Sequence, residues 1–323
     1  MGVLAGYHLG LGGAQIAYLV RPARAARLPE TLSLYSYDDA RTHRFGDYAV
    51  ITDPARIAEL RPDFVVVTLD GAALTGAEGM DMLSAIGTAI RPDDTTLIIG
   101  SLGIGLRERV VAASGLPEHR VILGGLTMLA HQADAAILPI HAPTDPSQLQ
   151  AADFAFRHLN DGGFRLEDRN LEAAVRFAAI FDRSGIGKCA IMSPDEFGVQ
   201  SRGIMPLFIA CQILDWPDAD ALYANPLWPI AVDAVRAIQG LAEHGAAGKT
   251  AAAGLTSERL AGVWNYLTAA ALPLDWQGFN AFHHGSKINA SDIRLLRDCV
   301  EWGDAEHRDM KAVKQIIARW EAL

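Results

Sequence analysis

Four titratable residues gather in one short stretch near the carboxyl end of the chain. His283, His284 and Lys287 lie within about one helical turn, and Asp292 follows two turns after His284. Helical neighbours three and four residues apart share a face, so Lys287 is expected beside His283 and Asp292 on nearly the face of His284. Histidine can donate a proton near neutral pH, and a nearby carboxylate fixes its tautomer. The stretch predicts either a catalytic or substrate-binding helix, with Lys287 binding a carboxylate, or a polar helix at a packing interface.

A metal site is the weaker interpretation of the same residues. Adjacent histidines point apart on a helix, and no cysteine or glutamate completes a ligand set. Cys189, Cys211 and Cys299 are odd in number and far apart, which suits three buried thiols in a reducing compartment. We therefore expect no bound metal and a cytoplasmic protein, since no signal peptide is visible.

The composition excludes two classes of partner. The 323 residues suggest about two domains, and a hydrophobic content of 50% allows a sizeable core. The net charge of −10 and the lack of a basic stripe argue against nucleic acid. No apolar run approaches the ~20 residues that span a membrane. A small molecule is the expected ligand.

The glycine pattern at the amino terminus resembles half of a dinucleotide-binding unit. Gly2 opens a helix-compatible run, three glycines end it by residue 13, and an apolar strand over 14–20 ends at Arg21. Gly2 can be the third glycine of G-x-G-x-x-G, the one that packs the helix on the sheet. The first strand and the two phosphate-facing glycines would then lie before Met1, so we expect a truncated or mis-started chain. The alternatives are a fold that lacks this strand, or an ordinary glycine before an amphipathic helix.

Arg21 bears on the choice of cofactor. It stands about 20 residues after Gly2, where NAD enzymes carry an acidic residue for the ribose 2′-hydroxyl. An arginine there suits a 2′-phosphate, because its planar guanidinium can pair bidentately with phosphate, and Arg24 could join it. The sequence thus favours NADP, the alternative being a solvated surface arginine.

Strands and helices alternate in the first half of the chain. Strands are expected over 48–52, 64–69, 95–99, 120–125 and 188–192, with helices after 53, over 79–90, after Gly105 and over 171–182. This alternation predicts an open α/β sheet, with ligands bound after Val20, Leu69 and Ile99 at strand carboxyl ends. The segment 22–47 is polar and poorly periodic, and a strand over 135–138 is possible. After residue 192, long helical periods dominate, over 196–216, 226–244, 256–271, 279–302 and 309–322. We therefore divide the chain into a domain over 1–192 and a helical domain over 193–323.

This combination resembles the ketopantoate reductase family. The resemblance rests on Gly2–Gly6, on Leu19–Arg21, on Gly103-x-Gly105, on Leu123–Gly125 and on Phe282–Lys287. It implies a Rossmann-like domain followed by an all-α domain of the 6-phosphogluconate dehydrogenase C-terminal type, and a homodimer. It also implies reduction of a 2-keto acid by NADPH, with Leu69, Ser101, Gly103 and Gly105 as further cofactor residues.

The sequence departs from the family pattern at several positions. Asp70 stands where the family places a phosphate-contacting lysine, and Ser101-Leu102-Gly103 replaces its Gln-Asn-Gly. The family's catalytic lysine is missing, because 196–216 contains no lysine and Arg202 is its only cation. Arg202 could stabilise an alkoxide but not donate a proton, or it could be a salt-bridged arginine. Asp292 matches the family's acidic residue, and the histidine helix is the natural replacement for the lysine.

Three functions are compatible with these residues. The first is an NADP-dependent reductase of a small 2-keto acid or related carbonyl. The second is an opine-type dehydrogenase that uses a His–Asp pair as acid and base. The third is a non-catalytic descendant that binds a dinucleotide or serves as a scaffold, which the departures favour.

Overall fold

The computed structural model describes residues 1–160 and 162–323, and these divide into two compact units. We call the first the α/β unit; it contains Met1–Ser101, Gly105–Ala135 and Ala142–Met192. The second, the helical unit, contains Leu102–Ile104, Ala136–His141 and Ser193–Leu323. No helix among the described residues is both long enough and apolar enough to cross a membrane.

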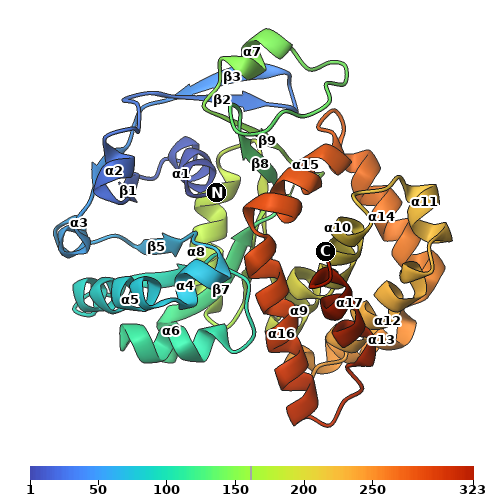
Figure 1. Ribbon diagram of the computed structural model, residues 1–323. Helices are drawn as coiled ribbons and strands as arrows, with labels where there is room; N and C mark the ends of the chain where they lie inside the picture. The colour runs from blue at the N-terminus through green and yellow to red at the C-terminus, as the bar shows by residue number, and fades with distance from the viewer. Residues whose placement is uncertain (161) are drawn as a thin grey trace. The chain divides into compact units, whose positions relative to one another are not determined.

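A five-stranded mixed sheet forms the centre of the α/β unit (Figure 1). Its strands run in the order β11 (Lys188–Met192), β10 (Gly162–Glu167), β7 (Val121–Leu126), β6 (Thr96–Ile99) and β5 (Phe64–Val67). β5, β6 and β7 are parallel, β10 is antiparallel to β7, and β11 is parallel to β10. The apolar runs correctly predicted four of these strands. The antiparallel β10 was not predicted.

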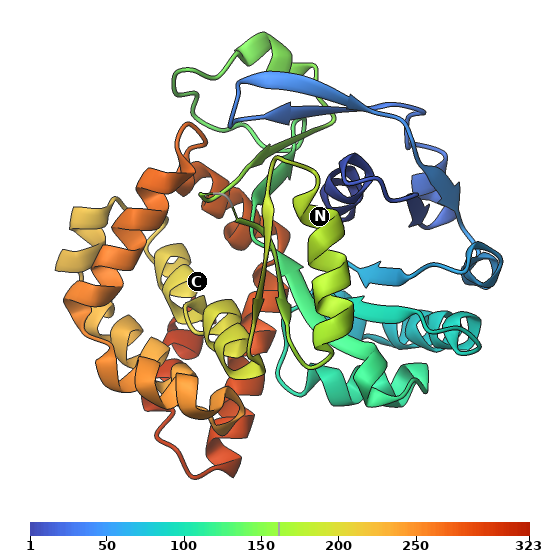
Figure 2. The same cartoon turned by 180° about the vertical axis from the view of Figure 1, so that it is seen from behind.

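Helices bury the two faces of this sheet. α5 (Ala77–Ile90) and α6 (Leu106–Ser114) lie side by side, and α8 (Leu171–Asp182) packs on β11 (Figure 2). Phe177 and Phe181 of α8 are fully buried in a core that includes Ile98 of β6 and Phe164 of β10. Asn170 caps α8 by accepting the Ala173 N–H, which fixes the start that the sequence predicts.

The strand expected over 14–20 forms, but outside the main sheet. β1 (Ala17–Leu19) pairs in parallel with β4 (Ala49–Ile51) in a two-stranded sheet of its own. Within the described residues, β1 and β5 each keep one edge without a strand partner. α1 (Gly2–Leu11) lies against both elements, because Gly6 contacts Tyr18 of β1 and Gly2 contacts Thr68 just after β5. The expectation of one sheet containing β1 was therefore wrong.

A four-stranded sheet accounts for most of the segment that carried no strand prediction. Its order is β3 (Arg41–Phe45), β2 (Leu32–Ser36), β9 (Phe154–Arg157) and β8 (Leu129–Gln132). β2 is buried because β9, far away in sequence, lies beside it, and local periodicity cannot show that partner. The possible strand over 135–138 does not form. The short elements of this unit are α2 (Pro22–Ala25), η1 (Pro54–Arg56), α3 (Ile57–Leu60), α4 (Gly71–Thr75), η2 (Glu118–Arg120) and α7 (Pro146–Gln150).

The helical unit contains most of the expected helices, with two of them divided. The span 196–216 forms α9 (Pro194–Arg202) and α10 (Met205–Ile213), because Pro206 fits only the first turn of a helix. The span 279–302 forms α15 (Trp276–Phe282), the π-helical turn η4 (His283–Lys287) and α16 (Asn289–Ala305). The others are α11 (Ala219–Ala224), α12 (Leu227–Gln239), η3 (Ala242–His244), α13 (Gly245–Gly254), α14 (Ser257–Ala271) and α17 (Lys311–Trp320).

The burial of α8 predicts a contrast between two of its positions. Phe177 is fully buried, whereas Val175, on the same helix, is 50% exposed. We expect Phe177→Ala to lower the free energy of unfolding by about 3–5 kcal/mol, because it removes core contacts and leaves a cavity. Val175→Ala, the matched control, should change it by less than about 0.5 kcal/mol. Chemical denaturation measures both, and equal losses would contradict this packing.

Candidate active site

The histidine stretch of the helical unit holds a buried hydrogen-bonded pair. Nδ1 of His284 lies 2.7 Å from Oδ2 of Asp292, and both side chains are nearly buried. The ring of His284 stacks on Phe208 of α10, with centroids 4.0 Å apart and planes inclined by 12°. The sequence predicts only that His284 and Asp292 lie two turns apart on nearly one face, and the structure brings them into contact. The carboxylate and the aromatic ring together fix the orientation of the imidazole.

The π-helical turn η4 determines which side chains of this stretch meet. The Ile288 N–H donates to the His283 carbonyl oxygen at 2.9 Å, one residue farther back than in an α-helix. The turn separates α15 from α16, so a continuous helix over 279–302 was a wrong expectation. The His283 and His284 rings stand nearly perpendicular, at 89°, which separates the roles that the two histidines can have.

His283 is an apolar packing residue in this geometry. Its ring stacks on Phe279, with centroids 5.3 Å apart, and its buried Nδ1 makes no hydrogen bond with a described residue. Burial, together with the neighbouring His284 and Lys287, lowers the pKa of His283 to about 3. The ring is therefore neutral at physiological pH and cannot supply a proton there.

Lys287 remains accessible beside the pair. Its side chain is exposed, with Nζ 6.0 Å from the centre of the Phe282 ring. The protein packed around it lowers the pKa of its ammonium from the usual value. It makes no ion pair with a described residue, so it can bind an anionic group.

Arg202 is committed to other partners within the helical unit. It is buried and donates to Nε2 of His244 at 3.2 Å and to the Gly103 carbonyl oxygen at 3.1 Å, and it pairs with Glu243 at 3.3 Å. Burial, then the charge of Arg202, lowers the pKa of His244 to about 4. These partners lie on η3 and in the segment 102–104, whereas the His284–Asp292 pair lies on η4 and α16. The structure does not group Arg202 with that pair.

The predicted cofactor residues of the α/β unit lie at the ends of its parallel strands. Ser101, after β6, donates its hydroxyl to the Leu69 carbonyl oxygen after β5 at 2.5 Å, so these two loops meet. A Cβ at Gly2 would lie 2.9 Å from Oγ1 of Thr68, so only glycine allows α1 to begin this close to β5. Gly105 has φ +60° as the N-cap of α6, a conformation that favours glycine.

Asp70 has a structural function at the end of β5. It accepts the Ala73 N–H at 2.9 Å and so caps α4. This explains an aspartate in a loop where the family resemblance implies a lysine.

Arg21 and Arg24 lie on the other side of α1, after β1. Arg21 precedes α2, is largely exposed and approaches Glu78 of α5 at only 3.5 Å. Arg24 lies over the ring of Phe154 at 5.9 Å from its centre. An exposed ion pair of this length contributes little, so Arg21 can exchange Glu78 for a phosphate.

Sequence reasoning missed two parts of these arrangements. Phe208 lies in a uniformly apolar run, so nothing in its spacing marks it as the stacking partner of His284. His244 and Glu243, the partners of Arg202, follow a helix by a few residues without any motif.

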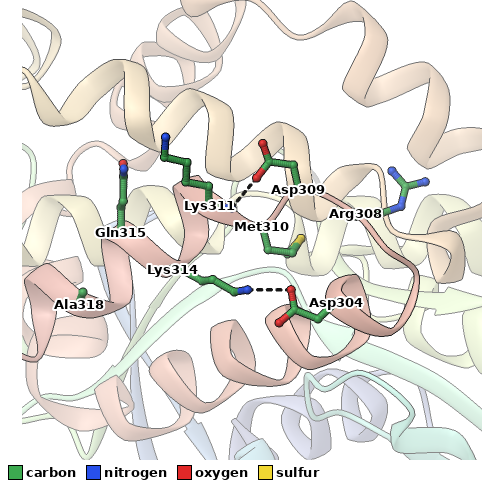
Figure 3. Close-up of a pocket in the computed structure, with 8 residues that line it drawn as sticks. All are labelled: Asp304, Arg308, Asp309, Met310, Lys311, Lys314, Gln315 and Ala318. Atoms are coloured by element: carbon green, nitrogen blue, oxygen red, sulfur yellow. Dashed lines mark hydrogen bonds and ion pairs between the residues drawn. The ribbon is translucent and has the colours of Figure 1, made fainter.

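The helical unit also has a shallow surface groove of about 390 Å³ (Figure 3). It lies over the end of α16 and α17, and its residues carry both charge signs, with Lys314 paired to Asp304 at 2.8 Å. The residues of the His284–Asp292 pair do not line it. No group of three or more potential metal ligands occurs among the described residues.

Comparison with known proteins identifies the fold. No protein-family model matches the chain, and no curated protein sequence matches it significantly. It is similar over its length to the solved 2-dehydropantoate 2-reductase of Geobacter metallireducens, with 20% identity over 99% of this chain and 95% of that one, TM-score 0.58. The chain is also similar to D-mandelate dehydrogenase, solved with NADH and anilino(oxo)acetate. The two share 13% identity over 100% of this chain and 94% of that one, with a TM-score of 0.67. A dimeric ketopantoate reductase from Staphylococcus aureus matches at 12% identity, covering 99% and 95%, TM-score 0.51.

These similarities show an α/β region followed by a helical region, arranged as in ketopantoate reductases and D-mandelate dehydrogenase. Because all identities are below 25%, they show the fold and not the activity.

Proposed function

We propose that this protein is an NADP-dependent reductase of a small 2-keto acid. The observation that carries the proposal is the buried His284–Asp292 pair in a chain with this fold. Asp292 accepts the hydrogen on Nδ1, which leaves Nε2 of His284 as the reactive nitrogen. Since Nε2 makes no hydrogen bond with a described residue, it can meet a substrate.

The chemistry assigned to the helical unit is proton donation and anion binding. His284 donates the proton on Nε2 to the keto oxygen, and Asp292 stabilises the imidazolium before transfer. Lys287 pairs with the substrate carboxylate. The product is a 2-hydroxy acid, and His284 recovers its proton from solvent. His283 and Phe208 pack beside the pair and exclude water from it.

Arg202 receives a different role in this proposal. Its buried guanidinium already donates to Gly103 and His244 and pairs with Glu243, which fixes it among these groups. It holds the Gly103 segment in place instead. His284 therefore replaces the lysine that the family resemblance implies.

The α/β unit fits a dinucleotide at two positions. Gly2 lets α1 begin close to Thr68 at the end of β5, and helix amino termini attract anions. Arg21 is exposed and weakly paired, which suits the 2′-phosphate of NADP, with Arg24 beside it. Leu69, Ser101 and Gly105 complete the set in this unit. NADPH would supply the hydride.

The open sheet edges support one further element of the proposed cofactor site. We propose that a parallel strand from a segment preceding Met1 lies between β1 and β5, beside α1. β5 is a continuous apolar strand, yet Val65 and Val66 are only half-buried, as expected where a neighbouring strand is missing. That strand would carry the two phosphate-facing glycines.

A non-catalytic, dinucleotide-binding protein is the second candidate. The engagement of Arg202 and the capping role of Asp70 favour it, because both positions have structural functions in place of those that the family resemblance implies. By analogy with the dimeric reductase of similar fold, we propose a homodimer for either candidate.

Substitution of His284 tests the reductase directly. We expect His284→Gln to lower kcat for 2-keto acid reduction by about 10²–10⁴-fold, because the general acid is lost, with little change in NADPH affinity. His119→Gln, at an exposed histidine of η2, is the control and should retain full activity. Steady-state kinetics on a panel of aliphatic and aromatic 2-keto acids measures both. NADPH binding without turnover of any keto acid would favour the non-catalytic candidate.

Arg21 is expected to select between the two nicotinamide cofactors. Arg21→Ala should weaken NADPH binding by about 10- to 100-fold, the loss of a hydrogen bond between charged groups, and leave NADH binding unchanged. Arg27→Ala removes another exposed arginine of the same segment and serves as the control. Fluorescence titration measures the affinities. Equal effects of the two substitutions, or equal losses for both cofactors, would refute this assignment.

Extension of the chain tests the proposed strand. A version that begins at an upstream in-frame start should bind NADPH at least about 10-fold more tightly and melt at a higher temperature, because it completes the sheet. An extension of equal length made of glycine and serine is the control. If the two extended proteins behave alike, no strand is added between β1 and β5.

A further inference from the structure

A second buried set of hydrogen-bonded side chains lies in the α/β unit, and the proposed function does not use it. Nε2 of His8, on α1, lies 2.9 Å from Nε2 of His158, which directly follows β9. Nδ1 of His158 lies 2.6 Å from Oδ2 of Asp38, in the turn between β2 and β3. Both histidines are almost completely buried. Three segments far apart in sequence thus meet in one line of polar atoms.

Counting hydrogens along this line determines their positions. Nδ1 of His8 lies 2.8 Å from the Leu4 carbonyl oxygen, which can only accept, so this nitrogen carries a hydrogen. In a neutral ring, Nε2 of His8 then has a lone pair and must accept from His158. The Asp38 carboxylate also only accepts. His158 therefore has an acceptor at each of its two nitrogens.

We propose that His158 carries hydrogens on both ring nitrogens and, with Asp38 and His8, forms a pH-sensitive clasp between α1 and the four-stranded sheet. One N–H points to the carboxylate and the other to the neutral His8 ring. When a second proton enters, the two facing Nε2 atoms both carry hydrogens, and this contact becomes repulsive. The clasp then opens and α1 loses its polar attachment to β9.

The groups around His8 keep its ring neutral at physiological pH. Its ring stacks on Phe181 of α8, with centroids 5.0 Å apart, and meets Tyr7, Phe156 and His158 edge-on. Burial lowers the pKa of His8 to about 4, an effect that the Leu4 hydrogen bond only partly offsets. Gly187 packs closely against the clasp, since a Cβ there would lie 3.0 Å from Nε2 of His158.

The other charged groups on the adjoining elements have partners of their own. Arg157 of β9 pairs with Asp38, so its positive charge stabilises the carboxylate at this end of the clasp. Burial alone would raise the pKa of Asp38, but the hydrogen bonds and charges of His158 and Arg157 lower it below the usual range. The remaining groups are His43 of β3 with Asp39, Asp182 of α8 with Lys188, Arg183 with the Gly12 carbonyl oxygen, and the exposed Arg41 and Arg44 of β3.

The direction of the pH effect follows from the lowered pKa of His8. In the unfolded chain this histidine gains a proton as the pH falls through about 6.5, whereas the folded protein resists until about 4. The unfolded state therefore binds more protons between these values, and stability falls as the pH is lowered through this window. Asp38, whose folded pKa is depressed, contributes to the loss only at lower pH.

Nuclear magnetic resonance tests the positions of the hydrogens in the unaltered protein. At pH 7, both ring nitrogens of His158 should show protonated ¹⁵N shifts, and a scalar coupling should connect Nε2 of His158 with Nε2 of His8 through the N–H···N bond. The coupling should disappear as the pH falls below about 4. An unprotonated nitrogen on His158 at pH 7, or the absence of the coupling, would overturn the proposal.

A glutamine at position 8 separates the clasp from simple packing. The amide oxygen of His8→Gln can accept from His158 but does not titrate, so we expect a folded protein with a flatter pH dependence. Between pH 7 and pH 4.5, the unfolding equilibrium of the unaltered protein should rise by on the order of 10- to 100-fold more than that of the variant. His119→Gln, on the exposed surface of the same unit, should retain the original dependence. Equal pH dependence of the variant and the unaltered protein would overturn the clasp.

Discussion

The helical unit buries an imidazole and a carboxylate against each other, and this pairing constrains the helices around it. Either group alone would be costly to remove from water, and the cost falls only when each satisfies the other. The 2.7 Å hydrogen bond between His284 and Asp292 meets this condition, but an uninterrupted α-helix would not supply the turn from which His284 faces α16. The π-helical turn departs from regular α-helical winding, and the two side chains meet beside it. π-turns are frequent at functional sites, which agrees with the role proposed for this pair.

Each unit contains a buried histidine hydrogen-bonded to an aspartate, but the second ring nitrogen of that histidine has a partner in only one of them among the described residues. In the α/β unit, both nitrogens of His8 and both nitrogens of His158 have partners, so the line of polar atoms is closed. In the helical unit, Nδ1 of His284 bonds to Asp292, whereas its Nε2 makes no hydrogen bond with a described residue. A closed pairing stabilises a fold and responds to pH, whereas an open one can exchange a proton with a ligand. The same residue types therefore support different roles because of one hydrogen-bond partner.

The sequence predicted those features that depend on local pattern. Continuous apolar runs marked β5, β6 and β7, and the helix expected over 171–182 forms as α8. The four-stranded sheet escaped prediction because β2 is buried by β9, about 120 residues away. The spacing of His284 and Asp292 predicted a nearly shared helix face, but it did not predict the π-turn that lies between them. Arg202 was a candidate because of its charge, and only its buried acceptors show where that charge is used.

The absence of the family's lysine is less damaging to a reductase than it first appears. Reduction of a keto group to an alcohol requires a donor that can transfer a proton, and an arginine cannot do so at neutral pH. A histidine hydrogen-bonded to a carboxylate can meet this requirement. In the proposed reductase Arg202 takes no part in the reaction, because it is tied to Gly103, His244 and Glu243. Among the described residues, Nε2 of His284 makes no hydrogen bond while Asp292 and Phe208 orient the ring, and this arrangement supports the proposed enzyme.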